Sequence, residues 1–289
     1  MVSFLTKFHR FFIRYPEFLI IGVQKAGTTT LFDMLNSYPN FCGSFDKEPG
    51  FFTNDVFYNQ GNDWYLKQFE RCNRGTIKFE ATPFYIYHPD AAKRIFSFNK
   101  RMKFIVILRE PAARCYSAWN MYRQFNLSGA DNIFEQFVQY GNPSNKNAIS
   151  DLLFAAQYPS FKQAVEDDIE RYRSRSTDIE PSFVRRGIYY DQIENYLQYF
   201  SLDNFLFLEQ RELSQPIELI RNISEFLKVA IDVSLVDNHI SSNVGDYLDE
   251  SAEIEKTLLL LRDFYREHNE KLFSLIGIHY DWNEKAEMK

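Results

Sequence analysis

The feature that most constrains this chain is an apolar strand followed directly by an anion-binding turn and a helix. Residues 18–22 are apolar and end at a glycine, and apolar residues recur at helical spacing from Leu31 to Leu35. Between them lie a lysine, Gly27 and three consecutive threonines. The N–H groups that open such a helix have no intrahelical acceptor, and the helix dipole favours negative charge there. We therefore predict a phosphate-binding strand–loop–helix unit in an α/β fold.

The loop differs from that of nucleoside triphosphatases. A Walker A loop reads G-x-x-x-x-G-K-[ST], and Gly22 and Gly27 keep its glycine spacing. Thr28 stands where the lysine that reaches the β- and γ-phosphates belongs, and a lysine is found at Lys25 instead. The loop therefore suits a shorter and less charged group than a triphosphate.

A second strand-to-helix junction supports a second anion contact. Apolar residues 104–108 end at Arg109, and Pro111 then opens a helix that includes Ser117. The planar guanidinium of an arginine suits phosphate, and a serine adds a hydroxyl donor. Both can reach one site above the carboxyl edge of a parallel sheet, where open α/β folds bind ligands. The alternative is a surface salt bridge beside an unrelated helical serine.

Together these segments resemble the sulfotransferases that use 3′-phosphoadenylyl sulfate (PAPS), in particular the heparan-type carbohydrate enzymes and their bacterial relatives. The 5′-phosphosulfate loop of that family reads P-x-K-[AST]-G-[ST]-[ST], and residues 23–29 read V-Q-K-A-G-T-T. The resemblance runs over residues 17–282. It implies that Arg109 and Ser117 bind the 3′-phosphate. It also implies that the 5′-phosphosulfate is held by Lys25, Ala26, Gly27, Thr28, Thr29 and Thr30.

The same resemblance implies a catalytic base. The family segment K-E-x-x-[FY]-F corresponds to residues 47–52, which read K-E-P-G-F-F. It implies that Glu48 removes the proton of the acceptor and that Lys25 stabilises charge on the leaving bridging oxygen. Apolar neighbours would raise the pKa of the carboxyl group. We expect these neighbours to be Phe45, Phe51 and Phe52. The alternative is an exposed loop carboxylate beside Lys47.

Two departures from the family pattern limit the resemblance. Many relatives read E-K-[ST]-x-x-Y, whereas Ala81 follows Glu80 here, and Lys78 lies three residues before Ala81. Some relatives place K-G-R in the cofactor-covering loop, whereas residues 241–247 read S-S-N-V-G-D-Y. Candidate cofactor contacts in that loop are Ser242 and Asn243, with a solvated loop as the alternative.

The length of 289 residues, with 45% hydrophobic residues, predicts one α/β domain over 17–289. We expect a P-loop-like parallel sheet flanked by helices on both faces, the sulfotransferase fold. Residues 127–184 are interpreted as an insertion or lid over the acceptor site, or as a helical extension that only packs. Strands are expected at residues 18–21, 76–79, 104–108 and 205–208.

Charge, histidine and cysteine content limit the possible partners, metals and cellular setting. A net charge of −6 argues against nucleic acid as a partner. The five histidines form no ligand cluster, and Cys42, Cys72 and Cys115 lack metal-site spacing, so no metal is expected. Three cysteines leave at least one unpaired, which favours a reduced, cytoplasmic setting.

The first 16 residues form a basic amphipathic pattern. Apolar residues within 4–15 fall on one helical face and Lys7, Arg10 and Arg14 on the other. Such a helix would contact a membrane surface or dock on the domain. No stretch approaches the roughly 20 apolar residues of a membrane span.

We therefore predict transfer of a sulfuryl group from PAPS to a hydroxyl or amine of a carbohydrate, with adenosine 3′,5′-bisphosphate (PAP) as product. One alternative is a P-loop kinase of a small hydroxyl compound, against which the absent Walker lysine argues. The other is a non-catalytic PAPS- or PAP-binding relative, for which Ala81 is the one indication. The acceptor, the choice between O- and N-sulfation and the oligomeric state are left open.

Overall fold

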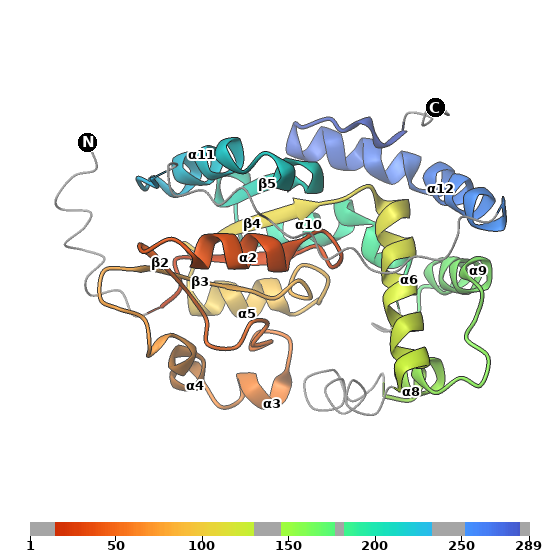
Figure 1. The fold of residues 1–289 in the computed structure, drawn as a ribbon, viewed down its shortest axis with the longest axis horizontal. Coiled ribbons are helices and arrows are strands. Elements are labelled where there is room, and N and C mark those ends of the chain that lie inside the picture. Colours follow the sequence, from red (N-terminus) through yellow and green to blue (C-terminus); the bar gives the residue numbers. More distant parts are fainter. Residues whose placement is uncertain (1–14, 130–145, 177–181, 233–251, 284–289) are drawn as a thin grey trace. The chain divides into compact units, whose positions relative to one another are not determined.

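A computed structural model describes residues 15–129, 146–176, 182–232 and 252–283, which are drawn in colour in Figure 1. The chain divides into two compact units. The first comprises Met1–Arg109 and Tyr196–Asn243, and the second comprises Glu110–Asn195 and Val244–Lys289. The predicted amphipathic helix at 1–16 lies outside the described residues except for its last two. The assignment of 17–289 to a single domain stays a prediction.

The first unit is built on a five-stranded sheet with strand order β2-β3-β1-β4-β5, in which all pairings are parallel. Its strands are β1 (Phe18–Gly22), β2 (Phe41–Gly43), β3 (Ile77–Ala81), β4 (Lys103–Leu108) and β5 (Phe205–Glu209). Its helices are α2 (Thr28–Asn36), α3 (Asp55–Tyr58), α4 (Asn62–Leu66), α5 (Ala91–Phe98) and α11 (Pro216–Leu227), with 3₁₀ turns η1 (Lys67–Phe69), η4 (Leu202–Asn204) and η5 (Gln210–Ser214).

The sheet has helices on both faces, with α2 on one face and α5 on the other (Figure 1). This follows from right-handed crossovers, because the chain moves in opposite directions along the sheet after β1 and after β3. All five residues of β1 and of β3 are buried, as expected for strands covered on both sides. The predicted fold class is confirmed. Four of the five strands lie where the sequence predicts them, whereas the three-residue β2 was missed.

The second unit is helical. Its elements are α6 (Pro111–Ser128), α8 (Lys146–Leu153), α9 (Phe161–Arg173), η3 (Arg185–Gly187), α12 (Ala252–Ile276) and η7 (Asp281–Asn283), while α10 (Tyr189–Leu197) crosses the boundary between the units. Helix α6 begins as predicted at Pro111, and the Glu110 carboxylate caps it by accepting from the N–H groups of Ala112 and Ala113 at 3.1 and 2.6 Å. Capping in the first turn therefore sets where this helix starts.

A buried ion pair anchors α9 in the second unit. The Asp168 carboxylate accepts from Arg185 Nε at 3.0 Å and from the main-chain N–H groups of Val184 and Arg185 at 2.6 and 3.0 Å. Both side chains are buried. The part of the predicted insertion 127–184 that is described therefore packs into this unit. Its role as a lid stays a prediction.

The cysteines differ from expectation. Cys42 on β2 and Cys72 are joined by a disulfide, with 5.8 Å between their Cα atoms. Cys115 is a buried thiol on α6. The expectation of three reduced cysteines was wrong, because the tertiary fold brings together two residues 30 positions apart in the chain.

Candidate active site

The predicted site residues of the first unit share one edge of the sheet. Lys25 follows β1, Glu48 lies in the loop after β2, and Arg109 comes directly after β4. The strands are parallel, so these three residues all follow carboxyl ends at the same edge. Ligands of open α/β folds bind outside this edge.

The loop between β1 and α2 has the geometry of an anion cradle. Gly27 caps α2 in a left-handed conformation with φ 91° and ψ 26°. A Cβ atom on Gly27 would lie 2.4 Å from Leu213 Cδ1, so both backbone and space require glycine here. Thr28 is buried, while Thr29 and Thr30 are half-buried in the first turn of α2. The N–H groups of that turn have no intrahelical acceptor and suit a phosphosulfate.

Arg109 contacts this loop directly. Its Nη1 atom donates to the main-chain oxygen of Lys25 at 2.8 Å, across 84 positions of sequence. The arginine predicted for the 3′-phosphate thus also holds the loop predicted for the 5′-phosphosulfate. Ser117 is buried on α6 in the second unit. The shared phosphate site of Arg109 and Ser117 stays a prediction, and Ser242 and Asn243 lie outside the described residues.

Glu48 is more exposed than expected. Its side chain is 49% exposed and its Oε1 atom lies 2.6 Å from Lys47 Nζ. Phe51 and Phe52 are buried in an aromatic cluster, and Phe45 is 67% exposed with Arg71 over its ring. The expected apolar enclosure of Glu48 is therefore not found, because half of its side chain is exposed.

Backbone strain singles out the two predicted catalytic residues. Among the described residues, four non-glycine residues have positive φ: Lys25, Glu48, Arg175 and Lys228. Arg175 follows the end of α9 and Lys228 caps α11, which are positions where a left-handed residue is ordinary. Lys25, at 71°, and Glu48, at 65°, have no such explanation. Strained non-glycine residues concentrate at functional sites.

These features agree with comparison to known proteins. The family model that describes the sulfotransferase domain matches residues 15–289 of this chain. The chain belongs to the sulfotransferase family. The family prediction is therefore confirmed.

Relatives of this sulfotransferase-family chain include two mammalian enzymes. It is 26% identical to heparan sulfate glucosamine 3-O-sulfotransferase 3B1 of Mus musculus over 93% of its own length and 65% of that protein. It is 23% identical to heparan sulfate glucosamine 3-O-sulfotransferase 5 of Homo sapiens, over 96% of its own length and 77% of that protein. The chain thus spans just under two thirds of the mouse relative.

One solved structure supports the fold. The sulfotransferase from Alicyclobacillus acidocaldarius superposes with a TM-score of 0.66 at 20% identity, covering 94% of this chain and all of that one. The likeness concerns the arrangement of sheet and helices.

The sequence predicted no role for one buried carboxyl group at the same sheet edge, that of Glu80. Glu80 on β3 is 0% exposed. Its Oε1 atom accepts from the hydroxyls of Tyr65 and Tyr85, both at 2.8 Å, and its Oε2 atom accepts from Thr82 at 2.6 Å. Burial is the main cause that raises the pKa of Glu80 to about 7. The three hydroxyl hydrogen bonds oppose this rise, and the nearby charge of Glu48 adds a smaller part of it. A glutamate between Phe79 and Ala81, in a strand that is buried along its whole length, is the signal that could have revealed this group.

On β3, no lysine lies close enough to Ala81 to take the place of the family's second lysine. Ala81 ends the strand and is buried. Lys78 lies three residues earlier, about 10 Å along an extended chain. The pKa of Lys78 is lowered by burial, and the charge of Glu17, which precedes β1, offsets part of this effect. Lys78 therefore belongs to the opposite end of the sheet from the predicted catalytic residues.

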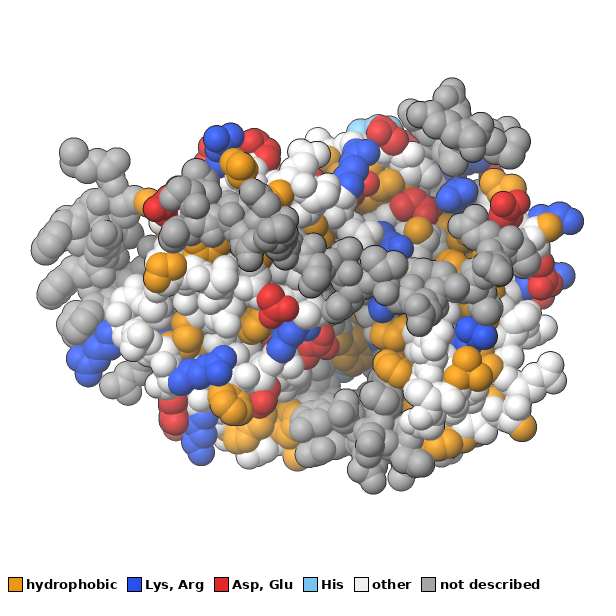
Figure 2. All heavy atoms as spheres, in the orientation of Figure 1, with side chains coloured by type: hydrophobic (Ala, Val, Ile, Leu, Met, Phe, Trp, Pro, Cys, Tyr) orange, Lys and Arg blue, Asp and Glu red, His pale blue; other side chains and the backbone are white. Residues whose placement is uncertain are grey.

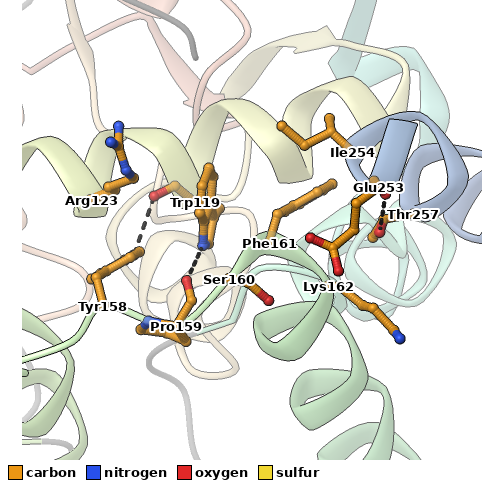
Figure 3. Close-up of a pocket in the computed structure, with 10 residues that line it drawn as sticks. All are labelled: Trp119, Arg123, Tyr158, Pro159, Ser160, Phe161, Lys162, Glu253, Ile254 and Thr257. Carbon is orange, nitrogen blue, oxygen red and sulfur yellow. Dashed lines mark hydrogen bonds between the residues drawn. The ribbon is translucent and has the colours of Figure 1, made fainter. Parts of the chain in front are cut away.

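A separate pocket of about 250 Å³ lies within the second unit (Figure 3). It is lined by Trp119, Arg123, Tyr158, Pro159, Ser160, Phe161, Lys162, Glu253, Ile254 and Thr257. None of these residues is predicted to bind PAPS or to act in catalysis. The Trp119 indole donates to the Pro159 carbonyl at 3.0 Å, and the rings of Trp119 and Phe161 are only 4% and 3% exposed. Little of either ring face is available to a ligand.

No helix in the described part of the chain is both long and apolar enough to cross a bilayer. Within the same residues, no three side chains of His, Cys, Asp or Glu are grouped as a metal site. The expectation that no metal takes part stays a prediction.

Proposed function

We propose that this chain transfers a sulfuryl group from PAPS to a hydroxyl or amine of a carbohydrate. The observation that best supports this is the pair of left-handed residues, Lys25 and Glu48, at the carboxyl edge of the sheet in a sulfotransferase-family chain. A kinase would need the Walker lysine, and Thr28 stands in its place.

The donor set of the loop fits a phosphosulfate. The main-chain N–H groups of residues 28–30, the hydroxyls of Thr29 and Thr30 and the ammonium group of Lys25 would hold it, with Ala26 and Gly27 allowing close approach. Arg109 and Ser117 would hold the 3′-phosphate that distinguishes PAPS from ATP. Ser242 and Asn243 are proposed as further contacts. PAPS supplies an activated sulfuryl group whose leaving group is PAP.

Glu48 is the proposed general base. Its carboxylate would accept the proton from the acceptor hydroxyl or amine as that atom attacks sulfur. Lys25 would stabilise negative charge on the bridging oxygen as its bond to sulfur breaks. Lys47, 2.6 Å from Glu48, would orient the carboxylate before the acceptor binds.

A carbohydrate acceptor is proposed from the heparan sulfate relatives. On the face drawn in Figure 2, basic and acidic side chains of the described residues are interspersed. A polyanionic acceptor would therefore rely on local contacts with individual basic groups. Residues 127–184 are the proposed lid over the acceptor.

The location of the protein stays a proposal. A cytoplasmic setting was expected from reduced cysteines, and the disulfide between Cys42 and Cys72 counts against that reasoning. Membrane contact through residues 4–15 is untested.

Calorimetry would test donor binding with PAP, AMP and ATP in the absence of magnesium. We expect micromolar binding of PAP that requires its 3′-phosphate and is lost in Arg109→Ala. Preference for ATP would favour the kinase alternative. PAP binding without transfer to heparan sulfate, to desulfated heparan sulfate or to water would favour the non-catalytic relative.

Substitutions would test the chemistry. Lys25→Ala and Glu48→Ala should each lower turnover of radiolabelled PAPS by about 100-fold or more, and Glu48→Ala should keep its affinity for PAP. Lys67→Ala and Glu70→Ala remove exposed charges of the same kinds from the same unit and serve as controls. Unchanged turnover in Glu48→Ala would reject the base assignment.

A further inference from the structure

We propose that Glu80 is a positioning residue for Glu48. Through Tyr65 and Tyr85, its buried carboxyl group holds residues 51–52, the end of the loop on which Glu48 lies. The inference rests on the proposed role of Glu48 as base, but the structural link can be tested without it.

The contacts form a continuous chain from Glu80 to the loop. Tyr85 donates its hydroxyl proton to Glu80 and accepts from the main-chain N–H of Phe52 at 3.5 Å. The Tyr65 ring stacks on Phe51 with 4.7 Å between ring centroids and 11° between planes. Phe52 packs edge-on against Tyr65 and Tyr85, at 5.1 and 5.4 Å. Each tyrosine that Glu80 orients is therefore packed against the loop.

The other end of the loop is held separately. The Gln68 side chain accepts from the N–H of Asp46 and donates to its carboxylate, both at 2.9 Å. Glu48 lies between this anchor and Phe52, and its left-handed backbone is a strained conformation that persists only where its surroundings hold it. Loss of the Phe52 anchor should therefore release Glu48 from its conformation.

The position of Glu80 also couples the two carboxyl groups electrostatically. Among the described residues, the titratable groups that interact with Glu80 are the phenols of Tyr65, Tyr85 and Tyr196 and the carboxylate of Glu48. The three phenols stay neutral in the physiological range, because burial raises the pKa of each of them. Titration near pH 7 in this cluster therefore belongs to Glu80, and its ionisation adds negative charge near Glu48.

Hydrogen-exchange mass spectrometry of the protein without ligand tests the link. In Tyr85→Phe and Glu80→Ala, peptides covering residues 44–54 should exchange about 10-fold faster than in the parent chain. Glu80→Gln keeps an acceptor for both tyrosines and should restore most of the protection. Tyr38→Phe removes the hydroxyl of another buried tyrosine in the same unit and should leave these peptides unchanged. If Glu80→Ala does not fold, Tyr85→Phe alone decides. Unchanged exchange in Tyr85→Phe would overturn the proposal.

Turnover distinguishes this proposal from the proposed function. With PAPS and heparan sulfate, Tyr85→Phe and Glu80→Ala should lower kcat about 10-fold and leave PAP affinity unchanged. The parent should show an inflection of kcat near pH 7 that Glu80→Gln lacks. Normal kcat in both variants, with Glu48→Ala inactive, would refute the positioning role alone. An active Glu48→Ala would refute the proposed base, and a parent that neither binds PAP nor transfers from PAPS would refute the proposed function, while the exchange data still report on the loop.

Discussion

The titration of Glu80 predicts how stability depends on pH, whatever the reaction. Burial raises the pKa of this carboxyl group from 4.5 to about 7 in the folded protein. The folded state therefore binds the proton more tightly than the unfolded state. The stability from this group is fully present below about pH 4.5 and is lost as pH rises through 7. The difference between these two pKa values corresponds to about 3 kcal/mol.

Glu80→Gln should remove this dependence, because glutamine keeps the shape of the protonated acid and does not ionise. We expect the unfolding free energy of the parent, minus that of Glu80→Gln, to fall by about 3 kcal/mol between pH 4.5 and pH 8. Urea denaturation at a series of pH values, followed by circular dichroism, measures the difference.

Glu70→Gln is the matched control, because it makes the same substitution at an exposed position of the same unit. Its difference from the parent should vary much less with pH. A constant difference for Glu80→Gln would show that Glu80 does not titrate in this range in the folded protein. A difference that rises with pH would show that its three hydroxyl donors outweigh burial.

Three further perturbations have expected outcomes. Gly27→Ala should destabilise the protein by about 1–2 kcal/mol, because φ is 91° and the new Cβ meets Leu213; an unchanged melting temperature would contradict this. Replacing Cys42 and Cys72 by serine should lower the unfolding free energy by about 3 kcal/mol in denaturant melts, and reduction of the parent should have the same effect. Equal stability of the parent with and without reductant would argue that the disulfide is not formed. Arg109→Ala should both weaken PAP binding and speed hydrogen exchange in residues 23–27, since its guanidinium bonds the loop; weaker binding with unchanged exchange would assign it to the ligand alone.

Several structural features could be predicted from local sequence. The loop at 22–30 is set by glycines, a strand end and a helix start, all within one short segment. The strands β1, β3, β4 and β5 are apolar runs, and α6 begins at a proline. The three-residue β2 has too few positions for a periodic pattern, and it forms because β3 offers a neighbouring backbone with which it pairs.

The sequence by itself determined the family, the sheet and the anion-binding loop, because each depends on residues that are neighbours in the chain. The tertiary structure decided what surrounds the predicted base. Phe51 and Phe52 are buried and Glu48 is half exposed, while Glu80 is buried and accepts hydrogen bonds from two tyrosines. It also joined Cys42 to Cys72 and brought Arg109 to the carbonyl of Lys25. These pairings join residues 5 to 84 positions apart, and only the packed fold specifies which distant groups meet.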